Sequence, residues 1–359
     1  MELCEHCLAI LLGSNKIERV EQPPESSCFL CGGSMASYIA NLSNSQFNYP
    51  AGSTSFYISI ASSPQLKAIM DKEEAHFPCT ATSIKTVVRD KSLSIISSKT
   101  PLVPDFTAPD VTYKLSFPQG LLSSKSNPIY IYGKYKKLTP GISQKRWAKY
   151  GSSVEAIIGE KLSDLVGAKE YYMHASGRED VDAINTAGRP FVMELVEPTT
   201  RELDLVKAQE SIGRDGMVAV SLLGFVPPSF TNVVTDSHGD KCYRAYIDKE
   251  LSEQQRSIIS SFKGIIEQRT PTRVKHRRAD KVRRRMVYSV IPGKDSRGPY
   301  LDICAEAGTY IKEFISGDAG RTVPSVSSLI SLPISCSFLV VTNVSTAYID
   351  RVFSKQRLG

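Results

Sequence analysis

The segment His174-Ala175-Ser176-Gly177-Arg178-Glu179-Asp180-Val181-Asp182 brings one glycine, one arginine and three acidic residues together in a short polar stretch. Glycine permits a tight turn because it has no Cβ atom. Arg178, two residues before Asp180, can orient that carboxylate or contact a phosphate. Spacing alone favours a surface turn that carries an ion pair. The segment is nevertheless a candidate catalytic loop, and its sequence context decides between the two interpretations.

The residues on either side of this segment predict an α+β domain. Before it, Ser152 and Glu155 form a potential capping box, and apolar residues recur at helical spacing as far as Leu165. A second amphipathic helix is expected after Ser252, with the apolar residues between 258 and 266 on one face. Runs typical of strands are found at 191–196, 217–225, 243–247, 285–290, 301–305 and 338–342. Strands mixed with a few long helices indicate a mostly antiparallel central sheet.

The N-terminal half predicts a smaller α+β domain. The stretch 34–54 is rich in Ser, Asn and Gly, which is typical of a connection. The stretch 65–74 predicts a short helix, and 83–96 predicts the end of a helix followed by a strand at 93–96. Further strands are expected at 56–60, 111–116 and 129–135.

The central motif resembles a known catalytic signature. Gly177-Arg178-Glu179-Asp180 resembles the G-R-x-D signature of tRNA pseudouridine synthases, and the string continued through Gly188-Arg189-Pro190-Phe191 closely resembles the archaeal-type synthases of the TΨC loop. Further stretches that resemble this family are Tyr132 to Leu138 with Gly141 to Trp147, Lys241 to Ala245, Gln268 to Asp280, and Gly308 to Phe314 with Gly317 to Thr322. The resemblance thus covers most of residues 129–330, and it also includes the N-terminal cysteine pairs.

This resemblance implies an α+β protein of three parts. Residues 1–35 would form a zinc ribbon, and residues 36–127 a THUMP-like accessory domain that binds RNA. Residues 128–359 would form the pseudouridine synthase domain, with a mostly antiparallel central sheet. The accessory domain is assigned by its position in the chain and not by a motif.

The resemblance also implies roles for individual residues. Asp180 would be the nucleophile, and Asp182 is its rival in the same loop. Tyr243 would stack on the flipped base and could accept the C5 proton. Lys312 would pair with Asp180 and favour its charged form. Glu179 is expected to be exposed or paired with an arginine.

The implied reaction converts uridine to pseudouridine. The carboxylate would attack the ribose or assist its deprotonation, and the detached uracil would rejoin the ribose through C5. The implied target is uridine 55 of the TΨC loop, with uridine 54 as a second target. The resemblance implies that no organic cofactor is needed, which fits the absence of a G-x-G-x-x-G loop and of a Walker loop from the sequence.

The basic residues suit a polyanionic partner such as the RNA that the resemblance implies, although a solvated charged surface has the same composition. The net charge is +7, and the stretch 269–285 holds nine Lys or Arg residues but only one acid. Such a run repels itself unless phosphates or carboxylates face it. The residues expected to contact RNA are Arg178, Lys134, Arg273, His276, Arg277, Arg278 and Arg321. We expect a monomer that binds the TΨC arm of tRNA and no membrane.

Two C-x-x-C pairs at the N-terminus predict a zinc site. Cys4, Cys7, Cys28 and Cys31 have the spacing of a four-cysteine zinc ribbon. All four positions are filled, so the zinc would be structural and not catalytic, because a catalytic zinc keeps one position open. The four single cysteines are expected to be small buried apolar residues in a reducing compartment; they are Cys79, Cys242, Cys304 and Cys336.

Other interpretations compete with this one. A non-catalytic zinc-ribbon RNA-binding protein would explain the charge and the cysteines but not the clustered motifs. A THUMP-bearing tRNA methyltransferase or thiouridine synthase would need a cofactor-binding or pyrophosphatase loop, and neither is evident. Zinc hydrolysis is disfavoured by the filled cysteine site. No apolar run approaches the roughly 20 residues that span a bilayer, and the N-terminus lacks a signal-peptide core, so a cytoplasmic archaeal enzyme is expected.

Overall fold

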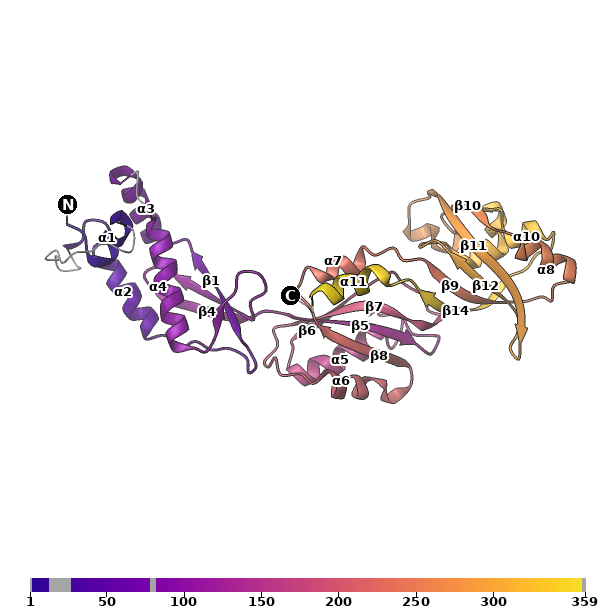
Figure 1. Ribbon diagram of the computed structural model, residues 1–359, viewed down its shortest axis with the longest axis horizontal. Coiled ribbons are helices and arrows are strands. Elements are labelled where there is room, and N and C mark those ends of the chain that lie inside the picture. Colours follow the sequence, from indigo (N-terminus) through magenta and orange to yellow (C-terminus); the bar gives the residue numbers. More distant parts are fainter. Residues whose placement is uncertain (1, 13–26, 78–81, 357–359) are drawn as a thin grey trace. The chain divides into compact units, whose positions relative to one another are not determined.

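The computed structural model describes residues 2–12, 27–77 and 82–356, and the chain divides into two compact units (Figure 1). Unit 1 comprises Met1–Ile129, Val166–Glu170 and Leu195–Leu203, and unit 2 comprises Tyr130–Leu165, Tyr171–Glu194 and Asp204–Gly359. The chain therefore returns twice to unit 1 after it has entered unit 2. None of the helices within the described ranges is both long and apolar enough to cross a membrane.

Unit 1 is built on a four-stranded sheet of order β2-β1-β3-β4. Strand β1 runs parallel to β2 and β3, and β3 runs antiparallel to β4. The elements are α1 (Glu5–Leu12), α2 (Ser34–Ser43), β1 (Ser55–Ala61), α3 (Pro64–His76), α4 (Ile84–Lys99), β2 (Val103–Pro104), β3 (Val111–Ser116) and β4 (Gly120–Ser126). The further division of this unit into a ribbon and a THUMP-like domain stays a prediction.

Two helices of unit 1 correct the sequence predictions. Helix α2 occupies part of the stretch that was expected to be a connection, because Met35, Tyr38 and Leu42 form a buried apolar stripe at helical spacing. The strand expected at 93–96 is wrong, because α4 continues through it to Lys99. Its buried face includes Ile96, which lies two turns beyond Val88. The β-branched residues in this run therefore misled the prediction, since packing overrides propensity.

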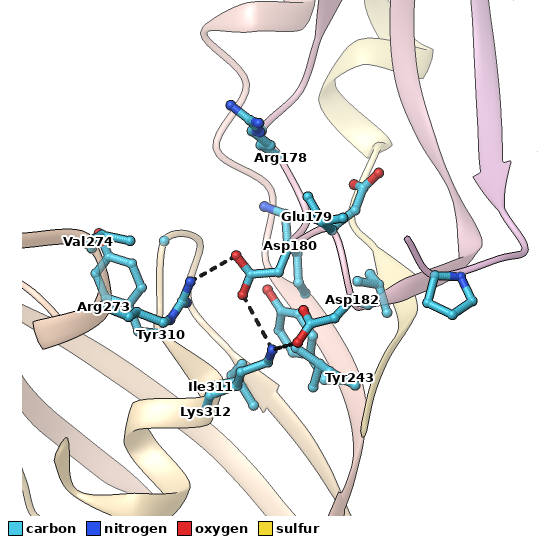
Figure 2. A pocket seen from close by; sticks show the side chains of 18 of the residues that line it. Arg178, Glu179, Asp180, Asp182, Tyr243, Arg273, Val274, Tyr310, Ile311 and Lys312 are labelled. Carbon is cyan, nitrogen blue, oxygen red and sulfur yellow. Dashed lines mark hydrogen bonds and ion pairs between the residues drawn. The ribbon is translucent and has the colours of Figure 1, made fainter. Parts of the chain in front are cut away.

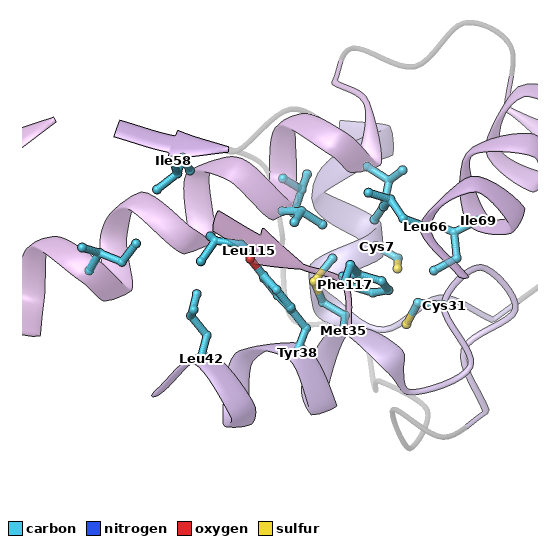
Figure 3. Packing of buried hydrophobic residues seen from close by; sticks show 14 of the residues in the cluster. Cys7, Cys31, Met35, Tyr38, Leu42, Ile58, Leu66, Ile69, Leu115 and Phe117 are labelled. Carbon is cyan, nitrogen blue, oxygen red and sulfur yellow. The ribbon is translucent and has the colours of Figure 1, made fainter. Parts of the chain in front are cut away.

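One buried apolar cluster holds unit 1 together (Figure 3). It includes Met35 and Tyr38 of α2, Leu115 of β3 and the following Phe117, together with the four N-terminal cysteines. The Tyr38 hydroxyl is satisfied inside this core by Ser92, at 2.6 Å. The cysteine segment therefore shares its packing with the sheet and the helices of unit 1.

Unit 2 is built on a ten-stranded sheet of order β13-β10-β11-β12-β9-β14-β7-β5-β8, with β6 paired to β7. Strands β14 and β7 run parallel, whereas β9, β10, β11 and β12 pair with their neighbours antiparallel. The sheet is therefore mixed, where the sequence predicted a mostly antiparallel one. The strands are β5 (Ile129–Lys137), β6 (Glu170–Ala175), β7 (Ile184–Val196), β8 (Val218–Phe225), β9 (Lys241–Ile247), β10 (Gly264–Arg269), β11 (Val282–Asp295), β12 (Gly298–Ala305), β13 (Thr322–Val323) and β14 (Cys336–Val344).

Helices cover both faces of the β5–β8 half of this sheet, with α5 and α6 on one face and α7 and α11 on the other (Figure 1). The helices are α5 (Val154–Val166), α6 (Leu205–Ile212), α7 (Phe230–Thr235), α8 (Glu253–Ser260), α9 (Ile311–Ser316), α10 (Val326–Leu329) and α11 (Ala347–Gln356), with short 3₁₀ turns η2 (Gly213–Asp215), η3 (Thr272–Arg277) and η4 (Asp318–Gly320). The motif predicted to be catalytic lies in the loop between β6 and β7.

Two local predictions in unit 2 are corrected. Helix α8 has the predicted capping box at Ser252, but it ends at Ser260. The following isoleucines belong to β10, where Ile266 is buried and Ile265 exposed, which is the alternation of a strand. The cap of α5 is Ser153 and not Ser152, because the Ser153 hydroxyl accepts the Ala156 N–H at 3.0 Å.

The prediction for the single cysteines is wrong for one pair. Cys242 and Cys304 lie directly opposite each other on β9 and β12, and they form a disulfide. The two cysteines are 62 residues apart in the sequence, so no local pattern indicated that they pair. Cys336 is free and half-buried, and Cys79 lies outside the described residues.

Candidate active site

A pocket of about 1120 Å³ lies in unit 2 and includes the predicted catalytic loop in its lining. The lining also includes Tyr243 from β9, Arg273 from η3, and Ile311 and Lys312 from the first turn of α9 (Figure 2). Segments far apart in the sequence thus bring acidic, basic and aromatic side chains to one cavity. Pockets with a few convergent polar groups are the usual place for a reactive centre.

Asp180 points toward two cations in this pocket (Figure 2). Arg273 Nη1 donates to Asp180 Oδ1 at 3.0 Å. Lys312 Nζ lies 3.9 Å from Asp180 Oδ2, at the limit of an ion pair. Arg273 is fixed in turn by Glu313, because its Nε donates to Glu313 Oε1 at 2.6 Å. The closest basic partner of Asp180 is therefore Arg273, which was expected to contact RNA and not the carboxylate.

Lys312 makes its shorter contact with the second aspartate of the loop. Its ammonium donates to Asp182 Oδ2 at 2.6 Å. Burial acts to raise the pKa of Asp182, but the Lys312 ammonium, a backbone hydrogen bond and the charge of Arg273 together lower it below its ordinary value. Lys312 thus bridges the two aspartates, where the sequence predicted a pair with Asp180 alone.

Tyr243 forms an aromatic wall of the pocket. It lies on β9 opposite Ile303 of β12 and Val341 of β14. Burial raises the pKa of the Tyr243 phenol to about 12, because the charged form is poorly solvated there. The phenol is therefore neutral at physiological pH, which suits a stacking surface and disfavours the proton-accepting role.

A buried lysine binds the backbone of the loop that carries Asp180. Lys137, on β5, has no exposed surface, and its ammonium donates to the carbonyls of Asp180 at 3.0 Å, Val181 at 2.8 Å and Ile142 at 3.1 Å. Burial lowers the pKa of Lys137 to about 8, although the nearby acids act in the opposite direction. Three carbonyl acceptors satisfy the three N–H groups of the ammonium.

Glu179 is also part of this support. It is buried and pairs with Arg189 of β7, with 2.6 Å between Oε2 and Nε. This outcome matches one of the two expectations for Glu179. The Glu179 carboxylate is therefore engaged within the protein, although Glu179 belongs to the pocket lining.

Four of the residues expected to contact RNA belong to the pocket lining: Arg273, described above, and Arg178, His276 and Arg278. Arg178, His276 and Arg278 are exposed and belong to the lining. Arg278 Nη1 donates to the hydroxyl of Tyr310 at 2.9 Å. The side chain of Arg277 lies outside the described residues.

Two of the other expected RNA contacts are engaged within the protein. Lys134 forms an ion pair of 2.9 Å with Asp350 and also donates to Thr346. Arg321 donates to the Thr270 carbonyl at 2.7 Å and pairs with Asp280. Their donors have internal acceptors within unit 2, which disfavours the expected RNA contact but does not test it.

Sequence reasoning overlooked Lys137 and Arg189. Lys137 lies in the stretch Tyr132 to Leu138, which was considered for its family resemblance, although it is in phase with the buried Ile129, Ile131 and Tyr135 on β5. That alternation could have marked it as an inward-facing residue. Arg189 carries no such signal, because it follows a glycine and precedes a proline inside β7.

The four N-terminal cysteines form a separate cluster in unit 1. Their sulfur atoms all lie within 4.8 Å of one another, and all four residues are buried. The sulfurs of Cys4 and Cys31 are 3.7 Å apart. Four thiolates about 2.3 Å from a zinc ion in a tetrahedron would be about 3.8 Å apart. The cluster therefore has the donor set and the size to hold one metal ion.

Comparison with known proteins agrees with these observations. A family model described as "Pus10, C-terminal" matches residues 130–345. The chain is 34% identical over 337 residues to the tRNA pseudouridine synthase Pus10 of Picrophilus torridus, and the match covers 90% of this chain and 87% of that protein. The Pus10 protein of Korarchaeum cryptofilum is 32% identical, with 90% and 94% covered.

The extent of the match differs among relatives. For the Pus10 protein of Methanothrix thermoacetophila the identity is 37%, over 70% of this chain but only 61% of the relative. Among solved structures, a Cbf5-Nop10-Gar1 complex is similar over 59% of this chain and 48% of its own, with 17% identity and a TM-score of 0.34. That score is too low to support an inference about the fold.

Proposed function

Because the chain belongs to the Pus10 family of tRNA pseudouridine synthases, we propose that it isomerises uridine to pseudouridine in the TΨC loop of tRNA, at uridine 55 and at uridine 54. The observation that carries the proposal is the position of Asp180 in the pocket, paired with Arg273 and facing a wall that contains Tyr243. A carboxylate, two cations and an aromatic face are what the reaction requires of the protein.

The target nucleotide must leave the RNA stack to reach this pocket. Extrusion costs a few kcal/mol, and enzymes offset it with contacts to the flipped base and the phosphates. We assign the stacking surface to Tyr243, which is neutral because its pKa is about 12. Ile311, Leu339 and Val341 supply apolar lining around it.

Asp180 then acts at the ribose. The N1–C1′ bond breaks and the C5–C1′ bond forms, while C5 loses its proton to solvent and N1 gains one. The carboxylate either attacks C1′ or removes a ribose proton, and both routes need it beside the sugar. Arg273 and Lys312 orient it there, since each approaches a different oxygen of the carboxylate.

The position of modification is testable with transcripts. A tRNA transcript treated with the enzyme should show pseudouridine at positions 54 and 55 when it is mapped by carbodiimide modification and reverse transcription. Replacement of uridine 55 by cytidine should remove one signal and leave the other. Pseudouridine confined to another arm of the tRNA would contradict the assignment to the TΨC loop.

Phosphate contacts should come from the exposed basic residues of the pocket rim. The Arg278→Gln variant should weaken tRNA binding and lower the slope of log Kd against log salt by about 1, because one phosphate contact is lost. Lys134→Gln is the matched control, since Lys134 is bound to Asp350 and Thr346. Equal slopes for Arg278→Gln and wild type would show that Arg278 does not face the RNA.

The cysteine cluster is proposed to hold a structural zinc ion. Cys4, Cys7, Cys28 and Cys31 would be its ligands, and their burial in the core of unit 1 supports a role in folding. Residues 36–127 are proposed as the THUMP-like RNA-binding domain, an assignment that rests on their place in the chain. No organic cofactor has a part in this proposal.

A further inference from the structure

The loop that presents Asp180 rests on a buried ion pair between Glu179 and Arg189, both of which also belong to the lining of the pocket. Glu179 and Arg189 each have only 1% of the side chain exposed, and Glu179 Oε2 lies 2.6 Å from Arg189 Nε. The contact is an ion pair without the alignment of a good hydrogen bond. Removing two charges from water is costly, so a pair buried this deeply needs further partners or a function.

Both members of the pair bind additional groups. The Tyr135 hydroxyl donates to Glu179 Oε1 at 2.7 Å, and burial raises the pKa of Tyr135 well above its ordinary value, so it stays a donor. Gln144 Nε2 donates to the Tyr135 hydroxyl at 2.7 Å and to the Gly177 carbonyl at 2.9 Å. The network therefore links two elements of unit 2 to the loop on both sides of Arg178.

Arg189 also contacts the backbone of the loop. Its Nη1 donates to the Ser176 carbonyl at 2.8 Å. At Gly177 the backbone has φ +74°, and a Cβ atom there would lie only 3.1 Å from the same Nη1. The guanidinium thus lies directly against the turn from which Asp180 projects, three residues further on.

We propose that Arg189 and Glu179 are positioning residues, which hold the turn at Ser176–Gly177 so that the Asp180 carboxylate reaches the ribose of the flipped nucleotide. This inference rests on the proposed pseudouridine synthase activity. The pair acts through the loop, and a shift of about 1 Å in a catalytic group is enough to cost about 100-fold in rate.

Positioning and stability can be separated by an apolar replacement of the whole pair. Breaking a buried ion pair by removing one partner destabilises a protein strongly, whereas replacing both partners with apolar residues of similar volume is often neutral. Methionine at both positions would fill the space of the pair. It could neither accept the hydrogen bond from Tyr135, as Glu179 does, nor donate to the Ser176 carbonyl, as Arg189 does. Only a positioning role predicts that stability returns while activity does not.

The experiment compares Arg189→Met, Glu179→Gln and the double variant Glu179→Met with Arg189→Met, all in the full-length chain. We measure the thermal midpoint, the Kd for unmodified tRNA, and the single-turnover rate of pseudouridine formation at saturating enzyme. In the double variant we expect a midpoint near that of wild type, a Kd within about twofold, and a rate about 100-fold lower. Arg201→Met is the matched control, because it breaks another largely buried ion pair, with Asp110 in unit 1.

A double variant that regains both the midpoint and the rate would overturn the inference, since the pair would then serve stability alone. A Kd that weakens as much as the rate falls would overturn it as well, because the pair would then serve binding. Equal rate losses in Arg201→Met would show a global effect and not a local one. If wild type itself forms no pseudouridine, the proposed function fails and the inference that rests on it fails with it, whereas an active wild type with a fully active double variant overturns this inference alone.

Discussion

Asp180→Asn should bind unmodified tRNA with the affinity of wild type and form no pseudouridine. The substitution keeps the size of the side chain and the contact from Arg273, but it removes the charge that attacks or deprotonates the ribose. We expect a single-turnover rate at least about 10⁴-fold below that of wild type, which corresponds to about 5.5 kcal/mol of lost transition-state stabilisation. Carbodiimide mapping measures the product, and filter binding measures the affinity.

Asp182→Asn is the matched control for this prediction. Asp182 lies in the same loop and receives the shorter contact from Lys312, at 2.6 Å, but it is not the motif's reactive position. Without the charge of Asp182, Lys312 can approach Asp180 more closely, so we expect the single-turnover rate to change by about tenfold or less. If Asp182→Asn were inactive and Asp180→Asn were active, the roles of the two aspartates would be reversed.

Cys31→Ser should release the metal ion from the N-terminal cluster and unfold the segment that carries it. The binding free energy of a structural zinc is about 10–16 kcal/mol and contributes directly to folding. The cluster is continuous with the core of unit 1, so the helices that contact it should lose stability as well. Elemental analysis should find one zinc ion per chain in wild type and none in the variant, and limited proteolysis should cut the variant in unit 1.

Cys336→Ser provides the comparison for the cysteine variant. Cys336 is free and lies on β14 of unit 2, whereas the four-cysteine cluster belongs to unit 1. This variant should retain zinc and resist proteolysis as wild type does. Metal-free wild-type protein that is stable would contradict the zinc assignment.

Several residues that line the pocket could be predicted because they lie in contiguous motifs. The Gly-Arg-x-Asp string located the loop, and the motifs around Tyr243 and Lys312 brought two more groups to the same pocket. The pairing among them could not be predicted. Arg273 makes the shorter contact with Asp180, and Lys312 the shorter contact with Asp182, because the choice of partner depends on how α9 and η3 lie against the loop.

The supporting residues were harder to find for a related reason. Lys137 and Arg189 are charged residues in buried positions, and charged residues are seldom fully buried unless they are paired. Their partners are backbone carbonyls and a glutamate brought together by the fold. Similarly, Cys242 and Cys304 are far apart in the sequence and become neighbours only when β9 pairs with β12. Long-range pairing of this kind leaves no local signal.

The most direct test of the central claim is tritium release from an unmodified tRNA transcript labelled at C5 of uridine. Formation of pseudouridine replaces the C5–H bond with a bond to the ribose, so every turnover releases the label. Wild type should release tritium equivalent to two uridines per tRNA, and Asp180→Asn should release none. Tight tRNA binding by wild type without any release would contradict the account and favour an RNA-binding protein that lacks catalytic activity.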